Sequence, residues 1–245
     1  MTDSIAAPAQ APGLLARIIG IFTSPKATFE KLLPTPKVLG AILTTGLVIG
    51  LSQAGPRLTE RGLQAALDQQ VQQTERFSGR QVSDEQYATM RRIAPFQTYG
   101  TLVFAPALGA LFVVIFAGLY FVIFNVVLGG TATFKQVVAV VSHGGFIASL
   151  GYLLGSIVQY FQGTANPMGP FTIGALLPML DDASFLSRFL SFISVFSIWG
   201  TIVNSIGFSV LYRRKAGGIF MTLFALTLVF AAIGATVMGI FTGGR

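Results

Sequence analysis

The sequence lacks cysteine altogether and contains one histidine among its 245 residues. A chain without cysteine forms no disulfide, binds no metal through thiolates and has no cysteine nucleophile. A single histidine also excludes metal sites that need several imidazole ligands. These absences remove disulfide-rich folds, thiolate metal centres and thiol-dependent enzymes from the candidate classes, and we expect neither a metal nor a cofactor.

Charged residues are scarce and unevenly placed. They make up 10% of the chain, whereas soluble domains average about 25%. A charge at the centre of a membrane helix costs about 3 kcal/mol, and about 20 apolar residues cross a bilayer as a helix. The sequence therefore predicts an integral membrane protein, and its apolar stretches without charge are residues 38–56, 93–134, 136–180, 189–212 and 216–244.

The charge that is present is mostly basic, with a net charge of +7. In a soluble protein such an excess would indicate nucleic-acid binding, but this chain has no basic stretch with interleaved aromatic residues. Its basic residues flank the apolar stretches, as in Arg213-Arg214-Lys215, where they set orientation and contact anionic lipids. We expect membrane lipids, other membrane proteins or a second copy of the chain as partners, and no nucleic acid.

The chain begins with a polar segment, residues 1–13, whose Ala, Pro and Gln content is typical of a disordered tail. It has no basic start followed by an apolar run, so it does not resemble a cleaved signal peptide. Residues 14–36 follow, with apolar side chains at helical spacing and a break at Ser24-Pro25. This pattern predicts amphipathic helices on the cytoplasmic membrane surface, or helices packed on the protein's own bundle.

The rest of the chain, residues 37–241, predicts a membrane domain with one polar insertion. Residues 57–93 form the insertion, with six basic and five acidic residues, and we expect a helical hairpin outside the bilayer, whose second helix begins at a capping box at Ser83. The fold class is therefore all-α: a polytopic membrane helical bundle with five transmembrane helices and an N-terminal amphipathic surface helix. The expected spans cover residues 37–53, 95–128 (with a kink at Pro106), 136–161, 188–211 and 217–241.

Loop charges predict the orientation. Three groups of basic residues lie on the same side of the membrane in this arrangement. They are the basic residues before the first span, Lys135 between the second and third, and the 213–215 cluster between the fourth and fifth. The positive-inside rule places that side in the cytoplasm. We expect a plasma-membrane protein with a cytoplasmic N-terminus and an extracytoplasmic C-terminus.

His143 is the residue on which an enzyme hypothesis would rest, because an ionisable group inside a span is a candidate site. No acidic residue lies in any of the expected spans, and the chain has no GxSxG motif. A neutral histidine bonded to a carbonyl group or to a neighbouring helix explains the residue better. Asp181-Asp182 likewise fits a helix start better than a metal site, since a hard cation needs more oxygen ligands.

Small and hydroxyl residues recur at helical spacing in three expected spans, which favours close helix packing. Two polar side chains, Asn125 and Asn204, either bond across helices or face a cavity. We predict turns at Pro25, Gly129 and Gly130. The predicted packing residues are Gly46, Gly50, Gly151, Gly155, Ser191, Ser194, Thr201 and Ser205, of which the serines and the threonine belong to a stripe along the fourth span.

Two blocks resemble the Ypt-interacting protein (YIP) family in its bacterial branch. Residues 14–34 place a Ser-Pro-x-x-x-Phe motif before the first span, and residues 129–143 place a Gly-Gly-x-x-x-Phe-Lys-Gln turn between the second and third. The resemblance implies a five-helix membrane domain without known catalysis. Eukaryotic relatives bind Rab-type GTPases and carry an Asp-Leu-Tyr-Gly-Pro motif, which this chain lacks, so Rab binding is not expected here.

The predicted function is therefore non-enzymatic: a scaffold or membrane-organising protein of the bacterial inner membrane, with a trafficking-like role through helix packing and partner binding. The alternative is a transporter or permease subunit for a small solute, with a cavity lined by Ser194, Thr201, Asn204 and Asn125. An intramembrane enzyme would need His143.

Overall fold

The computed structural model describes residues 12–166, 168–177, 179–181 and 184–241. Most of the predicted N-terminal tail, residues 1–11, lies outside them. Helices make up the described elements: α1 (Leu14–Thr23), α2 (Pro25–Leu32), α3 (Leu39–Ala54), η1 (Pro56–Leu58), α4 (Glu60–Ser78), α5 (Asp84–Phe121), η2 (Val122–Val127), α6 (Phe134–Gln162), α7 (Phe185–Ser191), α8 (Val195–Tyr212) and α9 (Ala216–Phe241).

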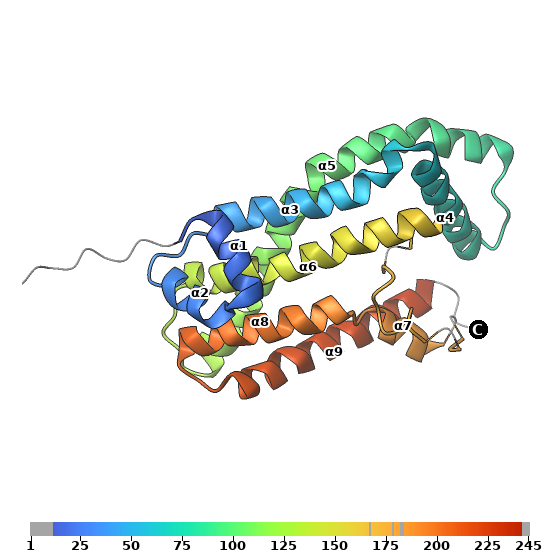
Figure 1. The fold of residues 1–245 in the computed structure, drawn as a ribbon. Helices are drawn as coiled ribbons and strands as arrows, with labels where there is room; N and C mark the ends of the chain where they lie inside the picture. Colours follow the sequence, from blue (N-terminus) through green and yellow to red (C-terminus); the bar gives the residue numbers. More distant parts are fainter. Residues whose placement is uncertain (1–11, 167, 178, 182–183, 242–245) are drawn as a thin grey trace, which may run out of the picture.

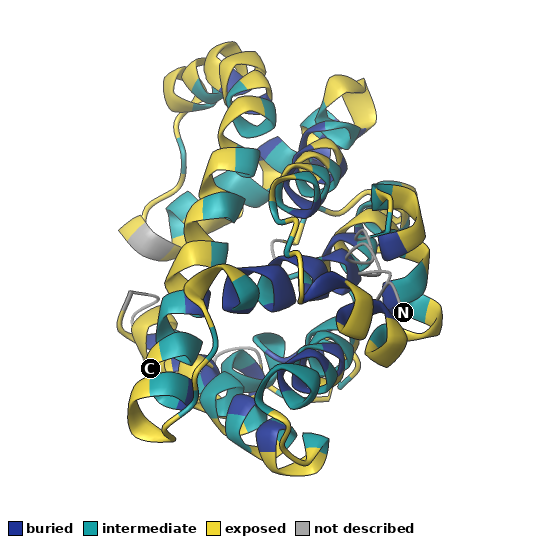
Figure 2. Cartoon of the chain, turned by 90° about the vertical axis from the view of Figure 1, so that its left-hand side faces the viewer, coloured by how far each residue is buried: buried dark blue, intermediate teal, exposed yellow. Residues whose placement is uncertain are grey.

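The long helices lie roughly alongside one another, with α6 in the middle (Figure 1). Helix α6 contacts α3 and α5 on one side and α8 on the other, and α8 contacts α9. The pair α1 and α2 covers one end of this bundle, while α4, α7 and the start of α5 lie at the other (Figure 1). Buried residues gather in the interior of the bundle, and the peripheral helices are exposed over much of their length (Figure 2).

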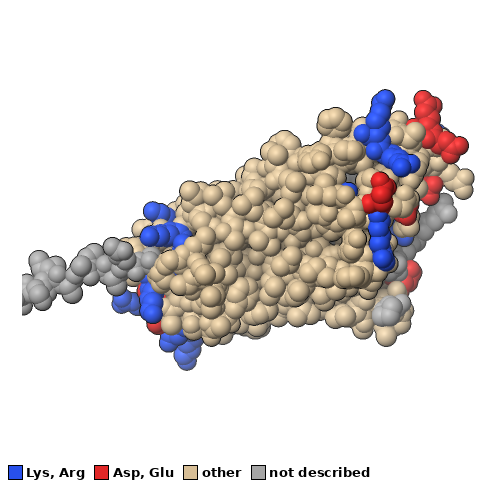
Figure 3. Space-filling view, turned by 45° about the horizontal axis from the view of Figure 1, so that its top comes forward, with Lys and Arg blue, Asp and Glu red and all other residues tan. Residues whose placement is uncertain are grey.

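The surface divides into two charged ends and a band between them that carries no charge on the face shown (Figure 3). Large apolar side chains are exposed along this band, among them Val103 at 70% and Phe104 at 63%. Exposing such an apolar surface to water is unfavourable in free energy, whereas exposing it to lipid is not. Four helices are long and apolar enough to cross a membrane: α5 with η2, α6, α8 and α9, while α3 is shorter. The protein is an all-helical membrane protein.

Local sequence explains where several helices begin. Ser83 accepts a hydrogen bond from Gln86 N while the Gln86 side chain accepts from Ser83 N, which is a capping box. Thr133 and Gln136 make the same pair of bonds at the start of α6. At Pro25, which begins α2, the Ser24 side chain makes no capping bond. Gly129 provides the positive φ of 68° that the preceding turn needs.

Two expected boundaries differ from the structure. Helix α5 begins at Asp84 and runs through Pro95 and Pro106, so the second helix of the predicted hairpin and the second span are one helix. Neither proline ends the helix, although a proline inside a helix removes one backbone hydrogen bond. The predicted fourth span is instead divided into α7 and α8, because Ser194 starts a new helix with its own capping box.

The first two helices pack on the bundle. Helix α1 contacts α6, and α2 contacts α8. Ile21, Phe29 and Leu32 are fully buried in the main apolar cluster, whereas Leu15 is 70% and Ile19 54% exposed. Both helices therefore have a buried face against their own bundle, and α1 in addition turns an apolar face outward.

Candidate functional site

A buried pair of polar side chains joins α1 to α6. Arg17 is 4% exposed and His143 fully buried. The Arg17 Nη1 group lies 3.0 Å from His143 Nε2 and donates to the carbonyl oxygen of Lys37 at 2.8 Å. His143 Nδ1 lies 2.8 Å from the Ala139 carbonyl oxygen. The pair thus connects α1, the segment just before α3 and the first half of α6.

The hydrogen-bond geometry defines the protonation state of His143. A guanidinium only donates, so His143 Nε2 must accept. The remaining proton is then on Nδ1, where it is donated to Ala139. His143 is accordingly neutral, and the positive charge of the pair belongs to Arg17. Burial lowers the pKa of Arg17 from its ordinary value, but a guanidinium remains charged in proteins.

Three buried polar atoms near this pair make no hydrogen bond to the described residues: Arg17 Nε, Thr45 Oγ1 and Asn204 Oδ1. Asn204 of α8 packs against Gly144, and Thr45 of α3 packs against Gly145, so both side chains contact α6 directly after His143. Sequence analysis left open whether Asn204 bonds across helices or faces a cavity. The structure places it against α6 with its oxygen unbonded.

The arrangement does not favour catalysis at His143. Ser142 Oγ lies 3.4 Å from His143 Nδ1, but that nitrogen already donates to Ala139 and therefore has no lone pair to accept the serine proton. The other ring nitrogen faces Arg17. Within the described part of the chain, no three His, Cys, Asp or Glu side chains come together as a metal site would require.

Asn125 makes a second polar connection between helices. Its side-chain nitrogen donates to the Ala132 carbonyl oxygen at 2.6 Å, and its oxygen accepts from the Tyr212 hydroxyl at 2.7 Å. Gly130 lies beneath the Tyr212 ring, which leaves no room there for a side chain. Asn125 therefore joins η2, the turn after it and the end of α8.

Of the four predicted glycines, Gly46, Gly50 and Gly151 lie at close contacts between helices, and Gly155 faces the loop after α6. A Cβ atom on Gly46 would be 2.6 Å from the Cα atom of Pro106, and one on Gly50 would be 3.2 Å from Ala105 Cβ. These two contacts bring α3 against α5. On α6, a Cβ atom on Gly151 would be 2.7 Å from Phe196 Cγ, and one on Gly155 would be 3.3 Å from Pro170 Cδ.

The predicted hydroxyl stripe is interrupted by the break between α7 and α8, so it is not one face of one helix. Its hydroxyls bond within their own chain segment rather than across helices. Ser191 donates to Ser187 O, Thr201 to Ser197 O and Ser205 to Thr201 O, while Ser194 Oγ accepts from Ser197 N as the α8 cap.

The Asp181-Asp182 prediction is tested only in part, because Asp182 lies outside the described residues. The helix that follows, α7, begins at Phe185 and is capped by the Ser184 side chain, which accepts from Ser187 N.

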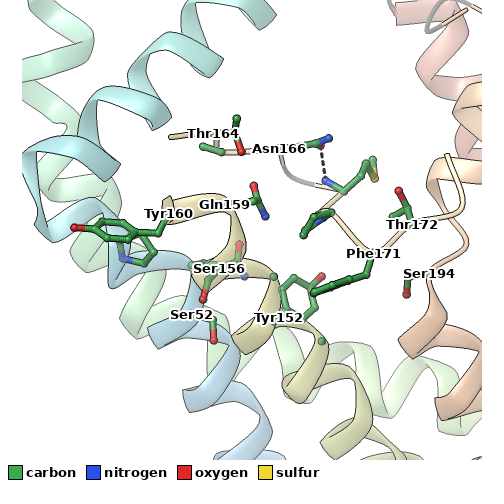
Figure 4. A pocket seen from close by; sticks show the side chains of 18 of the residues that line it. Ser52, Tyr152, Ser156, Gln159, Tyr160, Thr164, Asn166, Phe171, Thr172 and Ser194 are labelled. Carbon is green, nitrogen blue, oxygen red and sulfur yellow. Dashed lines mark hydrogen bonds between the residues drawn. The ribbon is translucent and has the colours of Figure 1, made fainter. Parts of the chain in front are cut away.

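A cavity of about 560 Å³ lies at the end of the bundle away from α1 and α2. Its walls come from the end of α3, η1, the start of α4, the second half of α6, the loop after α6 and the break between α7 and α8. The loop is held to that break by Ile173 N donating to Ile193 O and Val195 N donating to Phe171 O. Side chains facing the cavity include Ser52, Ser156, Gln159, Thr164, Asn166, Phe171 and Ser194 (Figure 4).

The cavity only partly matches the sequence prediction. Ser194 lines it, whereas Thr201, Asn204 and Asn125 do not. Two arginines that sequence analysis did not single out line it as well, Arg57 and Arg61. Arg61 donates to the Phe161 carbonyl oxygen and lies 5.7 Å from the centre of the Tyr160 ring. Burial lowers the pKa of Arg57.

Comparison with known proteins supports the resemblance. The family model described as the Yip1 domain matches residues 19–237. The curated protein "Membrane protein YknW" of Bacillus subtilis (strain 168) is 26% identical over 202 residues, which cover 82% of this chain and 79% of that protein. No solved structure matches the chain.

Proposed function

The chain belongs to the Yip1 domain family, and from this premise we propose that it is a non-enzymatic scaffold of the bacterial inner membrane. In this proposal it crosses the membrane five times, with its N-terminus in the cytoplasm, and organises other membrane components through its N-terminal helix pair. The observation that carries the proposal is the buried Arg17, which fixes α1 to the bundle and leaves Leu15 and Ile19 facing outward.

Helix α3, the first span in chain order, completes the five spans of the proposal together with the four longer helices. Its 16 residues reach about 24 Å at 1.5 Å each, somewhat less than the hydrocarbon core. Its two faces fit a span nevertheless. Glycines contact α5 on one face. The opposite face exposes a leucine at every fourth residue, as a lipid-facing helix does, namely Leu39, Leu43, Leu47 and Leu51.

The cytoplasmic side is assigned from the charges. The α1–α2 pair and the turn between α8 and α9 lie at the same end of the bundle (Figure 1), and both are basic. Single cysteines in this cysteine-free chain test the assignment. A membrane-impermeant maleimide on intact cells should label Ser78→Cys, in the hairpin turn, and spare Thr131→Cys, in the turn before α6. The reverse pattern would reject the orientation.

The scaffold role predicts that the outward face of α1 is needed for association. Leu15→Gln with Ile19→Gln changes this face and spares the buried one. Ala16→Gln with Thr23→Gln changes two other exposed positions of α1 and is the matched control. After cross-linking in native membranes, the first pair should lose co-purifying membrane proteins and fail to complement a deletion strain. Equal behaviour of the two pairs would count against a scaffold acting through α1.

The cavity favours a second candidate, a transporter or permease subunit. Ligand sites typically have such volumes. Yet α6 is buried almost continuously from Val137 to Ile147, so a solute path through the bundle would have to open its packed half. Uptake of solute by reconstituted protein, abolished by filling the cavity with Ser156→Phe, would support transport over the scaffold.

A further inference from the structure

The cavity near the end of α6 has walls of two chemical kinds. Amides and hydroxyls belong to its lining, among them Gln159 and Asn166 (Figure 4). Aromatic and small apolar residues belong to it as well, among them Phe171, Phe196 and Ala148. A site with both kinds of wall matches an amphiphile better than a small polar solute, because each part of the ligand finds a matching surface.

The charge in the cavity wall is entirely positive in the part of the chain that the structure describes, since Arg57 and Arg61 line it and no Asp or Glu does. Arg61 uses one N–H group on the Phe161 carbonyl oxygen, which holds its guanidinium in place without neutralising it. The Arg57 side chain makes no hydrogen bond or ion pair to any described residue. An anion would supply the missing counter-charge, and arginine forks suit phosphate oxygens.

The place of the cavity identifies the source of that anion. Its lining residues come from the ends of α3 and α6 and from the beginning of the charged hairpin. In a membrane we therefore expect it at the level where lipid headgroups give way to acyl chains. The Tyr160 ring beside Arg61 is also typical of this level.

We propose that this cavity binds one phospholipid with an anionic headgroup. The phosphate lies between Arg57 and Arg61, the headgroup contacts the amides around Gln159, and the start of an acyl chain enters between Phe171 and Phe196. The proposal requires a membrane protein and is independent of its orientation and of the scaffold role, so either can fail without the other.

Native mass spectrometry of the delipidated, detergent-solubilised protein tests the proposal. The probes are phosphatidylglycerol, phosphatidylcholine and inorganic phosphate at equal concentrations. We expect phosphatidylglycerol to bind about tenfold more tightly than phosphatidylcholine, given the typical contribution of arginines near a membrane surface. Inorganic phosphate should not compete.

Three variants locate the site. Arg57→Gln with Arg61→Gln should remove the preference for phosphatidylglycerol, whereas Arg91→Gln with Arg92→Gln, two exposed arginines of α5 outside the cavity, should keep it. Ser156→Phe fills the cavity without changing its charge and should weaken the binding of both phosphatidylglycerol and phosphatidylcholine. Equal losses in the two arginine pairs, unchanged binding to Ser156→Phe, or full competition by inorganic phosphate would each overturn the proposal.

Discussion

The two ends of the bundle differ in how they use their polar residues. At the α1–α2 end, the side chains of Arg17, His143 and Asn125 make hydrogen bonds that join separate segments of the chain. At the opposite end, polar side chains line a cavity of about 560 Å³, and Arg57 has no partner among the described residues. Helix α6 passes through both ends, buried in its first half and lining the cavity in its second.

This difference between the two ends suggests that the polar residues of the first end stabilise the fold and that those of the second end bind a ligand. A buried polar group costs free energy unless it is bonded, so the bonded groups of the first end hold helices together. Groups left facing a cavity can bind something else. We therefore expect substitutions at the first end to change stability, and substitutions at the second to change ligand binding with little change in stability.

The largest effect is expected from a bulky residue at Gly207. Its Cβ atom would lie 2.7 Å from Val140 Cγ1 and 2.9 Å from the Phe29 ring, whereas a Cβ atom on Gly155 would be 3.3 Å from Pro170 beside the cavity. Gly207→Leu should lower stability by about 3 kcal/mol through overpacking, and Gly155→Leu by much less. Thermal unfolding in detergent measures both, and equal losses would contradict the contrast between the two ends.

Removal of the Arg17 side chain should release α1. Arg17→Ala leaves His143 Nε2 and the Lys37 carbonyl oxygen without this donor, at a cost of about 2 kcal/mol. A cysteine at the buried position Ile21 should then react with a maleimide in detergent. Arg214→Ala removes an exposed arginine that also donates to a carbonyl group and should leave that cysteine protected. Protection in both variants would show that Arg17 does not hold α1.

Arg17 and His143 should act as one unit. In a double-mutant cycle of Arg17→Ala and His143→Ala, the two losses of unfolding free energy should fall short of additivity by about 1 kcal/mol, because both variants break the same hydrogen bond. The His143→Ala strain should still complement in proportion to its protein level. Loss of function in a fully stable His143→Ala protein would instead favour an enzyme.

The smallest effect is expected from Tyr212→Phe. The change leaves Asn125 Oδ1 without its donor and should cost about 1 kcal/mol. Tyr99→Phe, at a 60% exposed position, is the control and should be neutral in thermal unfolding. A neutral Tyr212→Phe would mean that water replaces the hydroxyl and that this end is less tightly packed than its contacts indicate.

Sequence alone was sufficient where the physics is local. Charge-free stretches predicted a helical membrane protein because charges are costly in lipid, and two motif blocks predicted the family. The capping residue Ser83 marked a helix start because its bonds reach only three residues along the chain. Ser194 carried the same kind of signal, but the charge-free stretch around it hid the division between α7 and α8.

Sequence was insufficient where the contact is distant. Arg17 and His143 lie 126 residues apart, and no spacing rule connects them, so the sequence did not predict their contact. The cavity is lined by side chains from several helices and a loop, and of these only Ser194 was predicted from the sequence to line a cavity. Arg57 and Arg61 looked like ordinary hairpin charges because their surroundings are set by tertiary packing.

The continuous helix of α5 and η2 has a mechanical consequence. Its 44 residues from Asp84 to Val127 extend about 66 Å at 1.5 Å each, roughly twice the thickness of the hydrocarbon core. In the proposed arrangement the apolar part of this helix lies in lipid, and its beginning projects beyond the bilayer beside α4, with which it is in contact. Because no loop interrupts the helix, we expect a change in its tilt within the bilayer to displace the projecting hairpin.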